Sequence, residues 1–127
     1  MPMISAVMLS RHPNLVSFLG ISSTELGQIH LVFELMEMGS LAALLVSDKV
    51  LEWQTRQRFA LELAHGMQHL HGLGMIHRDL KTDNCLVSAD MHAKVSDLGH
   101  PLPIVTCPSP RFTVLTITIH RTVWCVL

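Results

Sequence analysis

Four side chains between residues 77 and 99 could together support transfer of a phosphoryl group. That reaction needs little covalent help from a protein. It needs a residue that orients the attacking hydroxyl, a cation beside the transferred phosphate and ligands for metal ions. Magnesium prefers oxygen ligands, which carboxylate and amide side chains supply. Asp79, Lys81, Asn84 and Asp97 provide all of these groups within one short stretch of chain.

Short strands and one long helix must position these side chains. Residues 85–87 and 93–95 are expected to form a strand pair that brings the two ends of the stretch together. Residues 15–21 and 29–35 are two further apolar, β-prone runs, and the polar turn 22–27 between them predicts an antiparallel pair. Ser40 is a predicted N-cap for a short helix over residues 41–46.

A helical period begins near residue 53 and continues to residue 73. Its apolar residues recur at steps of four, four and three, and they are Phe59, Leu63, Met67 and Leu70. Gly72 and Gly74 are expected to end the helix. Because strands come first and a long helix follows, the sequence predicts an α+β fold.

Composition excludes several classes of protein. The chain has 127 residues, of which 49% are hydrophobic and 15% charged, and its net charge is −1. These values argue against a disordered chain and against a nucleic-acid or anionic-membrane partner. No basic leader is visible at the N-terminus, and no run of about 18 apolar residues predicts a membrane helix. Three cysteines without a CxxC pair indicate a reducing compartment, so we expect a cytoplasmic protein.

Residues 77–84 read HRDLKTDN, and they resemble the HRDLKxxN catalytic loop of eukaryotic protein kinases. Residues 97–99 read DLG and look like a variant of the DFG metal motif. Residues 11–16 are similar to the segment that enters the fourth strand of the kinase small lobe. Residues 31–41 look like the fifth strand and the hinge. Residues 70–76 resemble the end of the helix that leads into the catalytic loop.

The resemblance covers about residues 5–99, and it implies a role for each matching catalytic residue. Asp79 would orient the substrate hydroxyl and accept its proton. Lys81 would neutralise the transferred phosphate and leans toward serine/threonine specificity. Asn84 and Asp97 would hold Mg²⁺. The implied cofactors are ATP and Mg²⁺, and the implied substrate is a protein.

The same resemblance assigns residues to the nucleotide base. The Glu34 carbonyl and the Met36 amide would meet adenine, Phe33 would be the gatekeeper and Leu86 would lie under the ring. Phe33 and Met36 are expected to be buried. The hinge and the DLG variant resemble the tyrosine-kinase-like group of serine/threonine kinases.

The match to the family begins and stops abruptly. No glycine-rich loop precedes it, the first lysine is Lys49, and no activation segment follows Gly99. We therefore expect a partial kinase domain over residues 1–99 and an unassigned tail over residues 100–127. The leading hypothesis is a truncated serine/threonine kinase, or pseudokinase, that is inactive alone. The alternatives are a non-catalytic binding module or decoy that engages a partner kinase, and a working minimal kinase.

Several side chains have competing interpretations. His65 and His69 are four residues apart on the predicted helix, a spacing that can hold zinc, but no third ligand is evident and a solvated face is favoured. His77 is expected to pack in the core rather than act as a base. Cys85 is expected to be a small buried hydrophobic residue rather than a reactive thiol.

Overall fold

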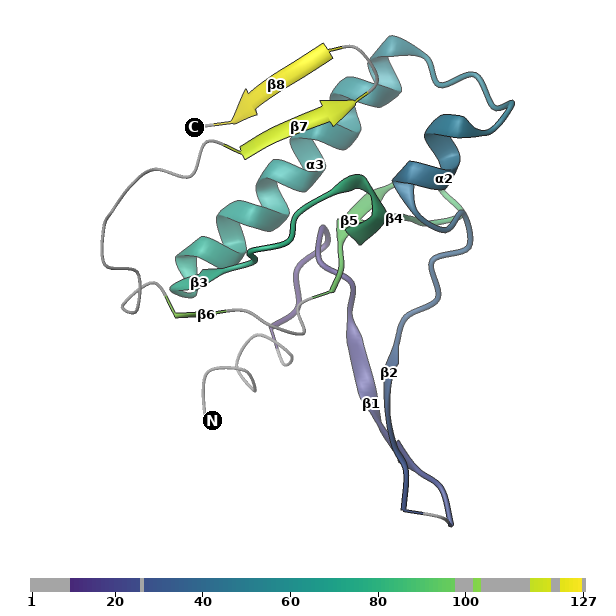
Figure 1. The fold of residues 1–127 in the computed structure, drawn as a ribbon, viewed down its shortest axis with the longest axis vertical. Helices are drawn as coiled ribbons and strands as arrows, with labels where there is room; N and C mark the ends of the chain where they lie inside the picture. The colour runs from purple at the N-terminus through teal and green to yellow at the C-terminus, as the bar shows by residue number, and fades with distance from the viewer. Residues whose placement is uncertain (1–9, 26, 98–101, 104–114, 120–121, 127) are drawn as a thin grey trace.

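The computed structural model describes residues 10–25, 27–97, 102–103, 115–119 and 122–126 (Figure 1). In chain order the elements are β1 (Phe18–Ser23), β2 (Ile29–Phe33), α2 (Leu41–Val46), α3 (Trp53–Gly72), β3 (Met75–Ile76), the 3₁₀ helix η1 (Thr82–Asn84), β4 (Cys85–Val87), β5 (Ala93–Val95), β6 (Leu102–Pro103), β7 (Leu115–Ile119) and β8 (Thr122–Val126). The described strands form antiparallel pairs, β1–β2, β3–β6, β4–β5 and β7–β8. This mixed architecture confirms the α+β prediction and is consistent with part of a protein kinase fold.

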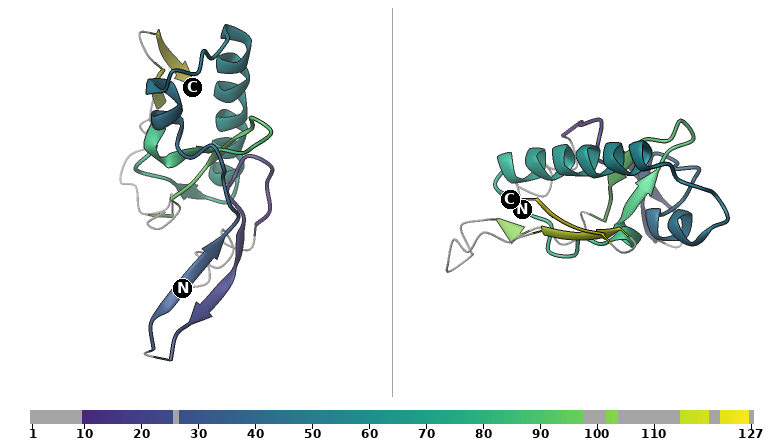
Figure 2. Two further views of the ribbon diagram at one scale, coloured as in Figure 1. Left: turned by 90° about the vertical axis from the view of Figure 1, so that its right-hand side faces the viewer. Right: turned by 90° about the horizontal axis from the view of Figure 1, so that it is seen from above.

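The β1–β2 hairpin extends away from the body that contains α3 (Figures 1 and 2). Its first strand begins at Phe18, not at Leu15 as the apolar run predicted. Leu15 instead forms a parallel bridge to Val95 and is only 2% exposed. The run is therefore divided, because its first residues join the core and only its later residues form the hairpin. The second strand also ends earlier than predicted, at Phe33.

Helices α2 and α3 begin and end largely as the sequence predicts. The Ser40 hydroxyl accepts a hydrogen bond from the Ala43 amide at 3.1 Å, so it caps α2. Helix α3 spans Trp53–Gly72, and Gly74 just beyond it has a φ of 73°. That left-handed conformation favours glycine and turns the chain from α3 into β3.

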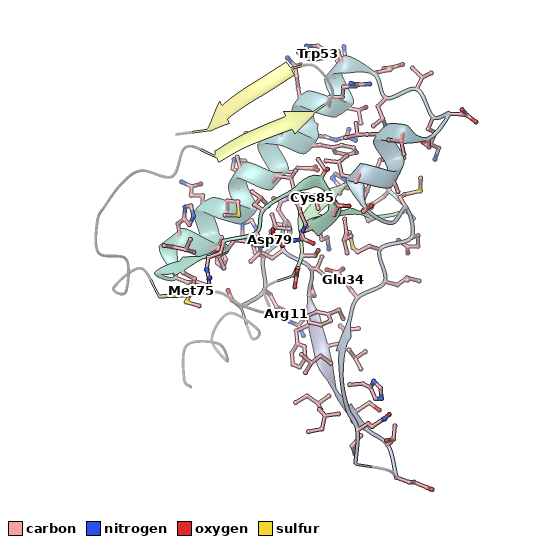
Figure 3. All side chains as sticks on the ribbon, viewed as in Figure 1. Arg11, Glu34, Trp53, Met75, Asp79 and Cys85 are labelled. Carbon is pink, nitrogen blue, oxygen red and sulfur yellow. The ribbon has the colours of Figure 1, made fainter. Side chains whose placement is uncertain are left out.

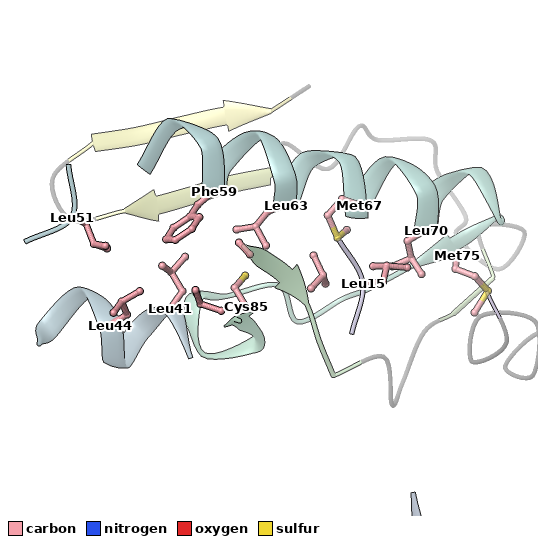
Figure 4. Packing of buried hydrophobic residues seen from close by; sticks show 13 residues of the cluster. Leu15, Leu41, Leu44, Leu51, Phe59, Leu63, Met67, Leu70, Met75 and Cys85 are labelled. Atoms are coloured by element: carbon pink, nitrogen blue, oxygen red, sulfur yellow. The ribbon is translucent and has the colours of Figure 1, made fainter. Parts of the chain in front are cut away.

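The hydrophobic core lies between α3, α2 and the β4–β5 pair (Figure 4). All four residues of the predicted helical stripe are buried, as their spacing requires. The cluster consists of Leu15, Leu41, Leu44, Leu51, Phe59, Leu63, Met67, Leu70, Met75, Cys85, Val87, Ala93 and Val95. This core supports the loop between β3 and β4, which carries the candidate catalytic residues.

The C-terminal part of the chain contains a further pair of strands. Strand β7 pairs with β8 in a register that runs from Leu115 opposite Val126 to Ile119 opposite Thr122. The boundary between a domain over residues 1–99 and a tail over residues 100–127 stays a prediction. Leu98 and Gly99 of the DLG motif lie outside the described residues. Within the described part of the chain, no helix is both long enough and apolar enough to span a lipid bilayer.

Candidate functional site

The loop between β3 and β4 is held in place by a buried histidine. His77 is only 3% exposed, and its Nδ1 accepts a hydrogen bond from the Asp79 amide at 3.3 Å. The other ring nitrogen, Nε2, lies 2.7 Å from the Ser96 carbonyl and donates to it. These two bonds require the neutral tautomer with its proton on Nε2. His77 thus packs in the core, as predicted, and ties the loop to the end of β5.

Three predicted catalytic side chains meet on this loop. The Lys81 ammonium lies 3.1 Å from Asp79 Oδ2, and the Asn84 side-chain amide donates to the same oxygen at 3.2 Å and to the Asp79 carbonyl at 2.8 Å. The hydrogen bond from Lys81 is the main cause that lowers the pKa of Asp79 below its ordinary value, and the same bond raises the pKa of Lys81. Asp79 is therefore an anion at neutral pH, as a residue that accepts a substrate proton must be.

The candidate metal ligands lie at the end of the same cluster. Because the Asn84 amide nitrogen binds Asp79, its oxygen Oδ1 stays available as a ligand. The Ser96 amide and hydroxyl both donate to the Asn84 carbonyl, at 2.8 and 2.9 Å, so the residue that precedes Asp97 is bonded to the backbone of Asn84. Two hard oxygen donors fit Mg²⁺, which commonly uses one or two protein ligands and fills its other positions with water and phosphate oxygens.

Backbone strain is found at two positions of this site. Arg78 has a φ of 75° and Asp97 a φ of 58°, and both are non-glycine residues in the left-handed region. Such conformations cost of the order of 1–3 kcal/mol each and persist only where the surroundings enforce them. Here they set the direction of the chain immediately before Asp79 and at Asp97, the candidate metal ligand.

The two backbone groups that the resemblance assigns to adenine are available for hydrogen bonds. In the described part of the chain, no residue hydrogen-bonds to the Glu34 carbonyl or to the Met36 amide. The Met36 side chain is 7% exposed, whereas Phe33 is 43% exposed, so the expectation of burial is right for Met36 and wrong for Phe33. An antiparallel bridge between Ser40 and Leu86 brings Leu86 to the end of the hinge.

An ion pair that the sequence did not predict connects the hinge to β5. The Lys94 ammonium contacts both carboxylate oxygens of Glu34, at 2.8 and 2.9 Å, and the Ser17 amide donates to one of them at 2.7 Å. Burial opposes ionisation of Glu34, but the bonds from Lys94 and Ser17 outweigh it and lower the Glu34 pKa. The Glu34 carboxylate thus joins β5 and the segment that leads into the hairpin to the hinge. Glu34 is labelled in Figure 3. Sequence spacing alone could not have paired residues so far apart in the chain.

The side chains with competing interpretations are also placed. Cys85 is 1% exposed, which confirms the predicted buried core position, and burial raises the pKa of its thiol to about 12. His65 is exposed, as a solvated helix face requires, but His69 is half-buried and stacks on His12. Among the described residues no cluster of three histidine, cysteine, aspartate or glutamate side chains could hold a metal ion.

Comparison with known proteins decides the family. The profile described as protein tyrosine and serine/threonine kinase matches residues 2–105. This chain belongs to the protein kinase family. The matched range includes the candidate hinge, the candidate catalytic loop and Asp97.

The kinase relatives include several serine/threonine enzymes. A probable serine/threonine-protein kinase of Dictyostelium discoideum is 43% identical over 90 residues, covering 70% of this chain and 15% of the relative. Human dual specificity testis-specific protein kinase 1 is 41% identical over 92 residues, covering 70% of this chain and 14% of the relative. Human receptor-interacting serine/threonine-protein kinase 1 is 43% identical over 89 residues, covering 70% of this chain and 13% of the relative. The chain therefore spans only about a seventh of the length of these relatives.

Proposed function

We propose that this chain provides the hinge and the catalytic loop of an ATP-dependent serine/threonine protein kinase site. The observation that carries the proposal is the contact of Lys81 and Asn84 with one carboxylate oxygen of Asp79. A phosphoryl transfer site needs this combination of anion, cation and amide, and the relatives named above include serine/threonine kinases.

Each residue has a distinct task in the proposed reaction. Asp79 hydrogen-bonds the hydroxyl of a protein substrate and accepts its proton as the oxygen attacks phosphorus. Lys81 leaves its contact with Asp79 to neutralise the transferred phosphoryl group. Asn84 and Asp97 would hold Mg²⁺, which when bound offsets the negative charge of the phosphates. The hinge groups, the Glu34 carbonyl and the Met36 amide, orient the adenine.

We further propose that the 127-residue chain binds magnesium nucleotide weakly and does not transfer phosphate at a useful rate on its own. The side chains of Asp79 and Lys81 are 61% and 52% exposed, so water screens the charges that should act on the reacting phosphate. Family kinases also use a lysine on a strand before the hinge, and Lys49 is the first lysine of this sequence.

A radiolabel transfer assay with the purified chain tests this proposal. We expect no magnesium-dependent incorporation into protein substrates above that of an Asp79→Asn variant. Sustained phosphorylation by the unmodified chain that Asp79→Asn abolishes would overturn the claim of inactivity, and it would make the chain a minimal kinase.

A binding role is a second candidate, and the β1–β2 hairpin favours it. Six large apolar side chains of this hairpin are 40–71% exposed, and they are Leu19, Ile21, Ile29, Leu31, Val32 and Phe33. Exposed apolar surface of this kind commonly marks an interaction site.

A partner kinase that covers the hairpin should bind the chain and lose affinity on Ile21→Asp, but not on the control Leu61→Asp on α3. Equal affinity of both variants would contradict the binding role.

A further inference from the structure

Two histidines from distant parts of the sequence stack where the hairpin joins the helix. His12 lies in the segment before β1, and His69 lies in the last turns of α3. Their ring centroids are 4.6 Å apart, and the ring planes differ by 25°. The Ser10 hydroxyl lies 2.6 Å from His69 Nε2. Arg11, which is labelled in Figure 3, belongs to the same segment as His12.

A backbone hydrogen bond identifies the protonation state of His12. The Asn14 amide donates to His12 Nδ1 at 3.1 Å. An N–H group can donate only to a ring nitrogen that carries no proton, so His12 is neutral with its proton on Nε2. Protonation of Nδ1 would remove this acceptor and put a positive charge against the stacked His69 ring.

The surroundings would not compensate a charge on His12. Burial, followed by the positive potentials of His69 and His65, lowers the pKa of His12 below 6.5. The neighbouring Arg11 is also cationic. Among the described residues, no carboxylate lies within ion-pair distance of His12 or His69.

Charged side chains on α3 and β5, the elements that pack against the His12 segment, already bind other residues or lie beyond ion-pair distance of His12. Glu62 of α3 contacts His92 at 2.6 Å, and Lys94 of β5 is bound to Glu34. Asp97, which follows β5, acts on Lys81. An imidazolium at position 12 would therefore meet other cations and no nearby anion.

The segment that His12 organises is a structural junction. The Asn14 carbonyl accepts from the Val95 amide at 2.8 Å, and the Asn14 side chain donates to the Ala93 carbonyl at 3.2 Å. A Cβ on Gly66 of α3 would lie 2.5 Å from the same Asn14 carbonyl, so segment and helix are in close contact. Asn14 thus connects the base of the hairpin to both α3 and β5.

We propose that the His12–His69 pair is a pH-sensitive latch that holds the segment before β1 on helix α3 and loosens it in mildly acidic solution. The direction of this pH dependence follows from the difference in the His12 pKa between the folded and unfolded chain. Since the His12 pKa is lowered in the folded chain, the latch contributes fully above pH 6.5, the ordinary histidine value. Its contribution is lost progressively as the pH falls below 6.5 toward the folded-state value.

Histidine titration by NMR on the full chain tests the first half of the proposal. We expect a His12 midpoint below 6.5, and we expect His69→Gln to raise it because one cationic neighbour is gone. The matched control is His71→Gln, an exposed histidine of the same helix, which should leave the midpoint unchanged. A His12 midpoint at or above 6.5, or one that His69→Gln does not raise, would overturn the latch.

Hydrogen exchange tests the second half. The protection factor of the Asn14 amide should fall between pH 7.0 and 5.5, by at most about tenfold for each pH unit below the unfolded midpoint. In His12→Asn, the side-chain oxygen can still accept from that amide but cannot titrate, so protection should not vary with pH. If His12→Asn does not fold, the fall in the unmodified chain is compared with His69→Gln, where it should be smaller. Protection that is independent of pH in the unmodified chain would contradict the proposal.

Discussion

Charge pairing within the catalytic loop sets the properties of individual residues. Lys81→Ala should raise the pKa of Asp79 toward its ordinary value, because the hydrogen bond from Lys81 is the main cause of its lowering. The control is Lys49→Ala, because the Lys49 ammonium contacts the Met38 sulfur at 3.9 Å and no carboxylate of the described residues. Carboxyl-carbon NMR titration measures both variants. An Asp79 pKa that Lys81→Ala leaves unchanged would show that the pair is not formed in solution.

The Glu34–Lys94 pair predicts a pH-dependent stability. Lys94→Met should lower the free energy of unfolding by roughly 1–3 kcal/mol at pH 7, since a charge-assisted bond is lost at a half-buried carboxylate. The Glu34 pKa is lowered from 4.5, so this contribution is present above pH 4.5 and is lost as the pH falls through the lower folded-state value.

Urea denaturation at pH 7 and pH 3 checks this prediction, with Lys49→Met as the control. The difference between Lys94→Met and the unmodified chain should shrink at pH 3. A difference that is the same at both values would mean that Glu34 does not titrate in partnership with Lys94.

At the residue scale, sequence reasoning succeeded where the signal was local. The loop that carries Asp79, Lys81 and Asn84 is continuous in the chain, so its residue types and spacing were enough to predict that they lie together. The Glu34–Lys94 pair and the His12–His69 stack were missed, because each joins residues far apart in the sequence. Periodicity along one helix placed His69 on a solvated face but contained no information about the segment that packs on it.

At the scale of elements, close packing between α3 and the junction segment makes one glycine essential. Gly66→Ala should destabilise the chain by roughly 1–3 kcal/mol, because its Cβ would meet the Asn14 carbonyl at 2.5 Å and backbone must shift. Gly72→Ala in the same helix meets nothing within 4 Å and should be neutral or stabilising by up to about 1 kcal/mol. Urea denaturation compares the two. Equal effects would contradict the packing of α3 on residue 14.

Element bounds were predicted best where packing and local pattern agree. Helix α3 has both a periodic stripe and a terminal glycine, so its span was nearly right. Strand β1 was misplaced because an apolar run does not reveal which of its residues enter a core. Leu15 pairs with Val95 through tertiary contact, and only the chain after it continues into the hairpin.

At the scale of the whole molecule, the core and the hairpin differ in how well they are covered. Leu63 of α3 is fully buried in the core, whereas Ile21 of the hairpin is 67% exposed. Leu63→Ala should therefore cost about 2–5 kcal/mol of unfolding free energy, and Ile21→Ala should cost less than about 0.5 kcal/mol. Denaturation of both variants measures the difference. A large loss from Ile21→Ala would mean that the hairpin packs against other parts of the chain.

We propose that the hinge and the catalytic loop form one nucleotide-binding surface. A magnesium-ATP titration followed by amide NMR is the direct test of this proposal. We expect shifts of the Met36 and Leu86 amides and of the Asn84 side-chain amide. The magnesium-dependent part of the Asn84 shift should be lost in Asp97→Asn but kept in the control Asp48→Asn. A folded chain in which these three resonances do not move at saturating magnesium-ATP would contradict the claim.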